Sequence, residues 1–94
     1  MNNLIILVGK VSSINSSSNS FTLKVERTNK DNLQIDADSF VCETWKGMYS
    51  YISSYISLED VILVKGKLVK DKEKFVIKID EFSIIQRTNK KISA

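Results

Sequence analysis

The sequence has no histidine and only one cysteine, and these two scarcities narrow the function classes open to it. Without histidine the chain lacks the commonest general base and the ordinary zinc ligand sets. A single cysteine cannot form a disulfide within the chain, and Cys42 stands in an apolar run, which is typical of a small buried core residue. We therefore expect no metal, no cofactor and no enzymatic activity. The one acidic grouping near an aromatic strand end, which an acid–base pair would require, is Asp36, Asp38 and Glu43.

Long apolar stretches are also missing from the sequence. The aliphatic run at residues 4–8 is far too short to span a bilayer, and the residues before it lack the basic start of a secretory signal. Since no disulfide framework points to an oxidising compartment, the sequence predicts a cytoplasmic protein without a membrane partner.

The length of the chain, 94 residues, limits it to one small domain. Apolar residues make up 43% and charged residues 27% of the sequence, which is typical of a folded domain. Domains of this size bury only ~60% of their unfolded surface, so a closed sheet, an oligomer or both would be needed for stability. We assign residues 1–86 to the domain and residues 87–94 to a flexible basic tail.

The net charge of +3 is concentrated at the end of the sequence. Three of the 14 basic residues, Arg87, Lys90 and Lys91, lie in the last nine positions, which contain no acid. Residues 1–85 therefore hold 11 basic and 11 acidic side chains. A polyanion partner must accordingly be inferred from local clusters of lysine rather than from the overall charge.

Apolar alternation and turn residues predict strands at residues 4–11, 21–27 and 39–45. Two further strands, at residues 61–69 and 75–85, form a hairpin with a charged tip.

Between the third and fourth strands the apolar spacing becomes helical. One side of a short helix would carry Met48, Ile52, Tyr55 and Ile56. This spacing places Tyr55 in the core and leaves Tyr49 and Tyr51 free to line a partner surface.

The predicted order is three strands, a short helix and two strands. Gly9 and Gly66 fall inside the first and fourth strands, where a barrel wall bends or another backbone approaches closely. This order predicts an all-β fold, a five-stranded OB-fold Greek-key barrel with the helix between strands three and four plugging one end. An SH3-like barrel is the alternative, although it would not need the helix.

Three stretches of the sequence share a pattern with a known family. Residues 3–11 consist of an asparagine, an aliphatic run, a glycine, a basic residue and a valine, and residues 20–27 read Ser-Phe-Thr-Leu-Lys-Val-Glu-Arg. An aromatic, Leu, Tyr-Leu, Gly and Leu pattern is matched, without a gap, by Trp45, Met48, Tyr55, Ile56, Gly66 and Leu68. In order and spacing these stretches resemble the bacterial single-stranded DNA-binding protein family, as a short OB-fold member or paralogue.

The sequence departs from that family at several points. The acidic C-terminal tip is absent, the loop of the last hairpin is shorter than in the family, and Leu58-Glu59 stands where the family usually has Lys-Gly. Ser39, with Phe40 beside it, replaces an aromatic of the third strand. The resemblance implies the OB-fold, single-stranded DNA as the partner, and a homodimer or homotetramer formed through residues 4–8, but not the role of a hub for other proteins.

Binding of a single strand requires aromatic rings on which bases stack and cations that contact phosphates. The candidate binding residues are three aromatics and six basic residues: Trp45, Phe40, Phe75, Lys10, Lys24, Arg27, Lys46, Lys65 and Lys67. A core position remains the alternative for each aromatic, and a solvated face remains the alternative for the lysines.

Two functions follow from this pattern. The first is non-enzymatic binding of single-stranded DNA, in replication, recombination or the maintenance of a mobile element. The second is a protein-interaction module that docks on a helicase, primase or replication initiator, which the neutral charge of residues 1–85 favours.

Overall fold

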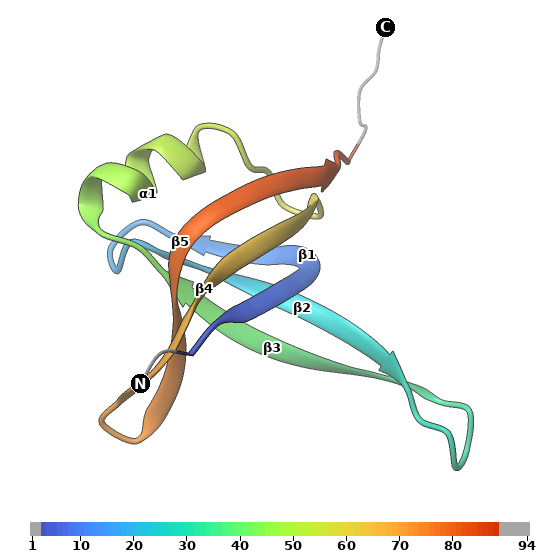
Figure 1. The fold of residues 1–94 in the computed structure, drawn as a ribbon. Coiled ribbons are helices and arrows are strands. Elements are labelled where there is room, and N and C mark those ends of the chain that lie inside the picture. The colour runs from blue at the N-terminus through green and yellow to red at the C-terminus, as the bar shows by residue number, and fades with distance from the viewer. Residues whose placement is uncertain (1–2, 89–94) are drawn as a thin grey trace, which may run out of the picture.

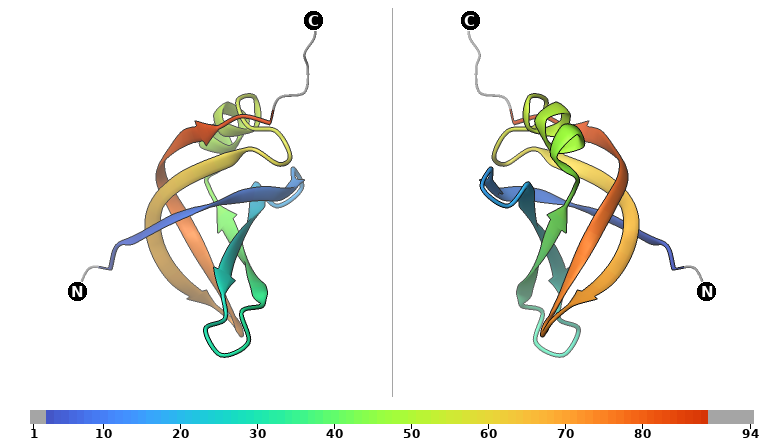
Figure 2. Two further views of the ribbon diagram at one scale, coloured as in Figure 1. Left: turned by 90° about the vertical axis from the view of Figure 1, so that its right-hand side faces the viewer. Right: turned by 90° about the vertical axis from the view of Figure 1, so that its left-hand side faces the viewer.

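A computed structural model describes residues 3–88, with the side chain of Lys46 left out. The elements are β1 (Ile5–Asn15), β2 (Ser20–Thr28), β3 (Ile35–Glu43), α1 (Lys46–Ser53), β4 (Val61–Asp71) and β5 (Lys74–Gln86). The strands close into a barrel in the order β1-β2-β3-β5-β4, with α1 at one end (Figures 1 and 2). The predicted five-stranded OB-fold barrel, with one short helix between the third and fourth strands, is confirmed.

The first strand holds two parts of the barrel together. Its first half pairs with β4 from Ile5 to Lys10, and its second half pairs with β2 from Lys10 to Asn15. Closure on the other side is short, because β3 and β5 run parallel and pair only at Cys42 with Ile77 and at Glu43 with Lys78. The β2–β3 and β4–β5 hairpins both extend beyond the body of the barrel (Figure 1).

Two glycines allow neighbouring strands to approach closely. The pairing of β4 with β5 shifts register at Gly66, where an added Cβ atom would overlap the carbonyl oxygen of Lys78. At Gly9 an added Cβ atom would lie 2.9 Å from the carbonyl oxygen of Lys24. Both positions confirm the close backbone approach expected for glycine inside a barrel strand.

The barrel interior is filled by aliphatic side chains, one phenylalanine and the thiol of Cys42, which is fully buried as predicted. Helix α1 and the loop after it contribute Ile52 and Ile56 to this core, which closes that end of the barrel.

The prediction for two of the helix tyrosines was wrong. Tyr49 is buried, although it is not part of the core cluster to which Ile52 and Ile56 belong. Tyr55 is 46% exposed and lies in the loop after α1, which ends at Ser53. Tyr51 is exposed, as expected.

A buried carboxylate fixes the end of the last strand. Asp60 is 1% exposed, and its two oxygens accept hydrogen bonds from the backbone N–H groups of Ser57 and Thr88, each at 2.9 Å. The Arg87 guanidinium donates to the carbonyl oxygen of Tyr55 at 2.9 Å. The first two residues assigned to the tail, Arg87 and Thr88, thus contact the barrel, while Lys90 and Lys91 lie outside the described residues. Within residues 3–88 no helix has the length and apolar character needed to cross a membrane.

Candidate nucleic-acid interface

The only tryptophan of the sequence lies at the start of α1, and its side chain is exposed to solvent. Trp45 is the N-cap residue, and its indole is 65% exposed. Its carbonyl oxygen accepts the first helical hydrogen bond from Tyr49 at 2.9 Å, and the N–H of the preceding Thr44 donates to Asn19 in the β1–β2 turn at 3.1 Å. The backbone on both sides of Trp45 is therefore fixed while the ring faces solvent, so the core alternative does not apply to it. Lys46 follows as the first residue of the helix.

A second exposed ring lies near the tip of the β4–β5 hairpin. Phe75 is 61% exposed and lies opposite Lys70, whose ammonium nitrogen is 5.9 Å from the ring centroid. This distance falls within the range of a cation–π contact. Phe40, in contrast, lies opposite Leu23 on the inward face and packs against the core. Of the three candidate aromatics, Trp45 and Phe75 are the ones with accessible faces.

Two of the candidate lysines lie side by side on the outer face of the sheet. Lys10 on β1 and Lys24 on β2 are direct register partners, and both are exposed. Lys10 lies 3.8 Å from the Glu59 carboxylate, and the two side chains are 48% and 61% exposed. Between solvent-exposed groups such a pair contributes little to stability.

The other two strand lysines, Lys65 and Lys67, lie on the outer face of β4. Lys65 is half-buried between its register partners Ile6 and Glu81. Lys67 is exposed and lies opposite Lys78, which is itself paired with Glu43 at 2.6 Å. The structure thus divides the lysines between two regions, one at β1–β2 and one at β4–β5.

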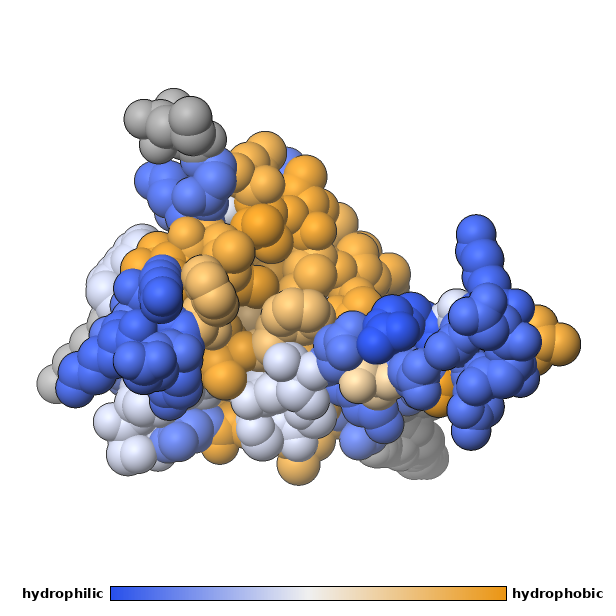
Figure 3. Space-filling model, turned by 90° about the horizontal axis from the view of Figure 1, so that it is seen from below, coloured by the Kyte–Doolittle hydropathy of each residue, from blue (hydrophilic) through white to orange (hydrophobic). Residues whose placement is uncertain are grey.

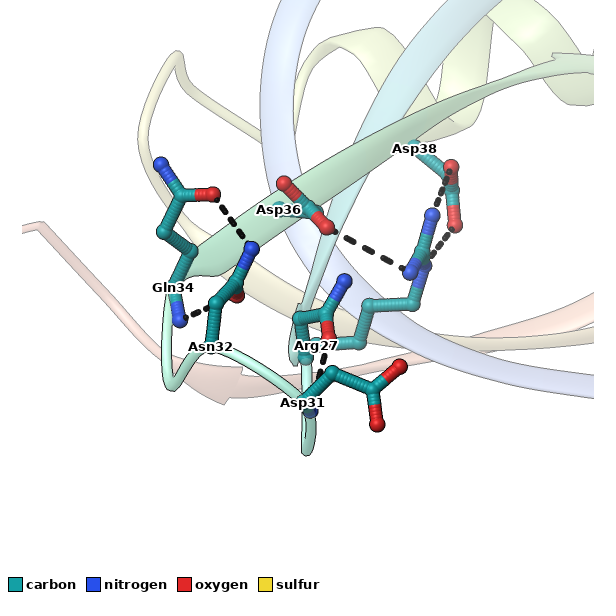
Figure 4. A network of polar contacts seen from close by, with 7 residues as sticks. Arg27, Asp31, Asn32, Gln34, Asp36 and Asp38 are labelled. Atoms are coloured by element: carbon teal, nitrogen blue, oxygen red, sulfur yellow. Dashed lines mark hydrogen bonds and ion pairs between the residues drawn. The ribbon is translucent and has the colours of Figure 1, made fainter.

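Arg27 stands apart from these lysines, on the extended β2–β3 hairpin. Its Nε donates to Asp38 at 2.9 Å, and an Nη atom lies 3.6 Å from Asp36 (Figure 4). The hydrogen bond from Arg27 lowers the pKa of Asp38, and the same bond raises the pKa of Arg27. The two carboxylates outweigh the single guanidinium, so this cluster carries no surplus of positive charge.

The loop beyond this cluster is shaped by amide side chains. Asn29 accepts a hydrogen bond from the N–H of Asp31 at 2.9 Å, and Asn32 accepts one from the N–H of Gln34 at 3.0 Å (Figure 4). Such local bonds are typical of Asx turns. The acidic grouping considered for catalysis is therefore engaged elsewhere, since Asp36 and Asp38 face Arg27 and Glu43 binds Lys78.

Sequence reasoning missed one aromatic cluster. The rings of Tyr51 and Tyr55 lie 4.8 Å apart, and Tyr51 also meets Phe82 edge-on at 6.2 Å. The sequence did not predict this cluster because the helical spacing placed Tyr55 in the core. Among the residues that the structure describes, no group of three histidine, cysteine, aspartate or glutamate side chains could hold a metal ion.

No protein-family model and no curated protein sequence matches the chain. Solved structures do match its fold. A small single-stranded DNA-binding protein from Streptomyces coelicolor superposes with a TM-score of 0.71 at 17% identity, covering 90% of this chain and 93% of that one. The mitochondrial single-stranded DNA-binding protein Rim1 from S. cerevisiae gives a TM-score of 0.70 at 8% identity, with coverage of 96% and 100%. PriB from Ralstonia solanacearum gives 0.65 at 14%, with coverage of 89% and 97%.

The barrel is an OB-fold, the architecture that it shares with these solved structures. The superpositions cover nearly the whole of each chain, so this OB-fold is shared as a complete unit rather than as a fragment. At such low identity the likeness establishes the architecture, and the side chains described above carry the argument for function.

Proposed function

We propose that this OB-fold binds single-stranded DNA without catalysing a reaction, by stacking bases on exposed rings and by contacting phosphates with lysines. The observation that carries the proposal is the exposure of Trp45. Its indole is 65% accessible, although tryptophan has the largest side chain in the sequence and would bury a large apolar area. An aromatic ring that faces solvent on a fixed backbone loses little conformational freedom when a base stacks on it. Phe75, with Lys70 beside it, offers a second place where a ring and a cation meet.

The similarity to two proteins whose names state single-stranded DNA binding supports this assignment. We place the activity in replication, recombination or the maintenance of a mobile element, where unpaired DNA arises.

We further propose that the protein forms a homodimer or homotetramer through β1. Leu4, Ile6 and Val8 alternate along one face and are 66%, 54% and 46% exposed, while Ile5 and Leu7 pack against the core. Figure 3 shows a broad hydrophobic area between the hydrophilic surfaces of the two long hairpins. An uncovered aliphatic face of this kind favours association with a second copy. The measurement is the mass in solution, which should correspond to a dimer or tetramer for the wild type and to a smaller assembly or a monomer for Ile6→Lys. A monomeric wild type would contradict this part of the proposal.

The test of DNA binding is a titration of fluorescently labelled oligothymidylate, with the emission of Trp45 recorded in parallel. We expect quenching of the indole and a loss of affinity of about five- to 150-fold in Trp45→Ala, the range that applies to base stacking in single-stranded DNA-binding OB-folds as a class. Tyr51→Ala is the matched control, because Tyr51 is an exposed aromatic elsewhere on α1. Equal affinity of Trp45→Ala and the wild type would contradict the proposal.

A second candidate function is that of a docking module for a helicase, primase or replication initiator. It is favoured by basic side chains that are already engaged by acids, namely Arg27 and Lys78. Added salt separates the two functions. Strand binding weakens steeply with salt, whereas an apolar docking surface shows little salt dependence and no affinity for an oligonucleotide.

A further inference from the structure

The two lysines that face each other across β1 and β2 are an unusual pairing. Lys10 and Lys24 are direct register partners on the outer face, so their Cβ atoms are about 5 Å apart. Like charges placed directly opposite one another destabilise a sheet. Such an arrangement is balanced when an anion lies between the two ammonium groups.

Neither lysine of this pair is firmly neutralised within the protein. The side chain of Lys24 has no hydrogen bond or ion pair to any residue that the structure describes, and the Lys10–Glu59 contact is long and exposed. Glu26, two residues along β2, shares the outer face with Lys24 but forms no ion pair with either lysine within the described residues. The comparable pair on β4 and β5 differs, because Lys78 is bound to Glu43 at 2.6 Å.

The lysine pair borders a groove of about 190 Å³. The groove forms where β1 leaves β2 and turns to pair with β4. Its lining combines apolar walls, a bare glycine backbone and the charged side chains, namely Val8, Gly9, Lys10, Lys24, Val25, Glu26 and Val61. Ammonium groups suit a phosphate, and adjacent valine side chains suit the apolar face of a sugar or base.

We propose that this groove is a nucleotide subsite, in which Lys10 and Lys24 hold one backbone phosphate and the attached sugar and base lie against Val25 and Val61. The inference rests on the proposed function and adds a defined path for the bound DNA along the barrel. From Lys24 the outer face of β2 continues to Thr22, and the strand begins at Ser20, which is 6% exposed and about 14 Å from Lys24. Ser20 lies opposite Glu43, and Glu43 precedes Trp45 by two residues. The bound DNA would therefore run along β2 from the subsite to the indole.

The experiment compares Lys24→Gln with Lys30→Gln by titrating oligothymidylate over a series of salt concentrations. Each variant removes one exposed lysine from the β2–β3 region, but Lys30 lies in the loop and not beside the groove. For a lysine that contacts a phosphate of a single strand, we expect the slope of log K against log salt to fall by about 0.7. The double variant Lys10→Gln with Lys24→Gln should lower it by about 1.4 if both contacts form. Lys30→Gln should keep the wild-type slope.

Thermal melting at low salt shows whether the variants are folded. We expect Lys24→Gln to melt at or above the wild-type temperature, because the substitution removes a like-charge contact. If the wild type binds with Trp45 quenching and Lys24→Gln has the same slope as Lys30→Gln, the subsite is wrong and the proposed function stands. If the wild type does not bind the oligonucleotide at any salt concentration, the proposed function and the subsite both fail.

Discussion

The Lys78 ammonium lies 2.6 Å from the Glu43 carboxylate, across the parallel contact that closes the barrel between β3 and β5. Only two register pairs make this contact, and Glu43 with Lys78 is one of them. The pair therefore has two effects. It supports the closure of the barrel, and it neutralises the positive charge of Lys78 on the outer face near Trp45. A protein that bound DNA with this face would gain a phosphate contact if the pair were broken.

We expect Glu43→Gln to bind oligothymidylate more tightly than the wild type, because the substitution frees Lys78 and removes a negative charge. The slope of log K against log salt should steepen by about 0.7 if Lys78 then meets a phosphate. Stability should fall by about 0.2–1 kcal/mol in urea unfolding, as for other partly exposed ion pairs. Asp31→Asn, which removes a carboxylate from the distant loop, is the control. Unchanged or weaker binding by Glu43→Gln would mean that the bound DNA does not lie near the contact between β3 and β5.

The three glycines should respond differently to alanine. Gly66→Ala forces a Cβ atom into the Lys78 carbonyl and should cost about 1–3 kcal/mol or more, with a smaller loss for Gly9→Ala, where the nearest backbone oxygen is 2.9 Å away. Gly47→Ala is the contrasting variant, since its Cβ would meet only the Trp45 ring at 3.6 Å. Alanine in place of a helical glycine should raise stability by about 0.5–1 kcal/mol. Urea unfolding of the three variants tests this ranking, and a Gly66→Ala protein as stable as Gly47→Ala would refute it.

Much of the barrel could be predicted because period-two alternation and glycine position are local signals. Phe21 and Leu23 point inward as their spacing indicates, and Gly66 lies where two backbones meet. The helix was harder, since its end at Ser53 is not marked by a strong stop signal. Without that end the sequence could not show that Tyr55 lies outside the helix, where it is exposed.

The candidate site could be predicted only in part for a related reason. Exposure of Trp45 and Phe75 depends on which rings the closed barrel has room for, and either position was open from the sequence. The opposition of Lys10 and Lys24 depends on the register of β1 against β2, which is set by the bulge between Val11 and Ser13 as well as by the turn. Sequence position alone could not give that register.

The thiol of Cys42 should be inert in the folded protein. Burial raises its pKa from the usual 9.0 to about 12, and the thiolate is the reactive species. Because the folded state holds the proton more tightly than the unfolded state, this group's contribution to stability is present below pH 9 and is lost as the pH rises towards 12. A disulfide reagent at pH 8 should therefore modify Cys42 at the rate of unfolding, and at once in concentrated urea. Rapid modification under native conditions would contradict the buried position.

Removing Arg27 should leave DNA binding unchanged within about twofold, although arginine is in general a strong phosphate ligand. Its guanidinium is already held by Asp38 at 2.9 Å and lies 3.6 Å from Asp36. The cluster has one positive and two negative groups, so it does not attract a polyanion. Arg27→Gln and Lys24→Gln, measured side by side at low salt, should differ clearly in affinity, with the loss confined to Lys24→Gln.

The same variant has an independent readout at the carboxylate. The hydrogen bond from Arg27 holds the pKa of Asp38 below its ordinary value of 3.8, so the support that this pair gives the hairpin is present above that pH and is lost as the pH falls. In Arg27→Gln the Asp38 carboxyl should titrate closer to 3.8 in a carbon-detected NMR experiment. Loss of affinity equal to that of Lys24→Gln, with an unchanged Asp38 titration, would mean that Arg27 leaves its carboxylates to meet the strand and that the β2–β3 hairpin belongs to the binding surface after all.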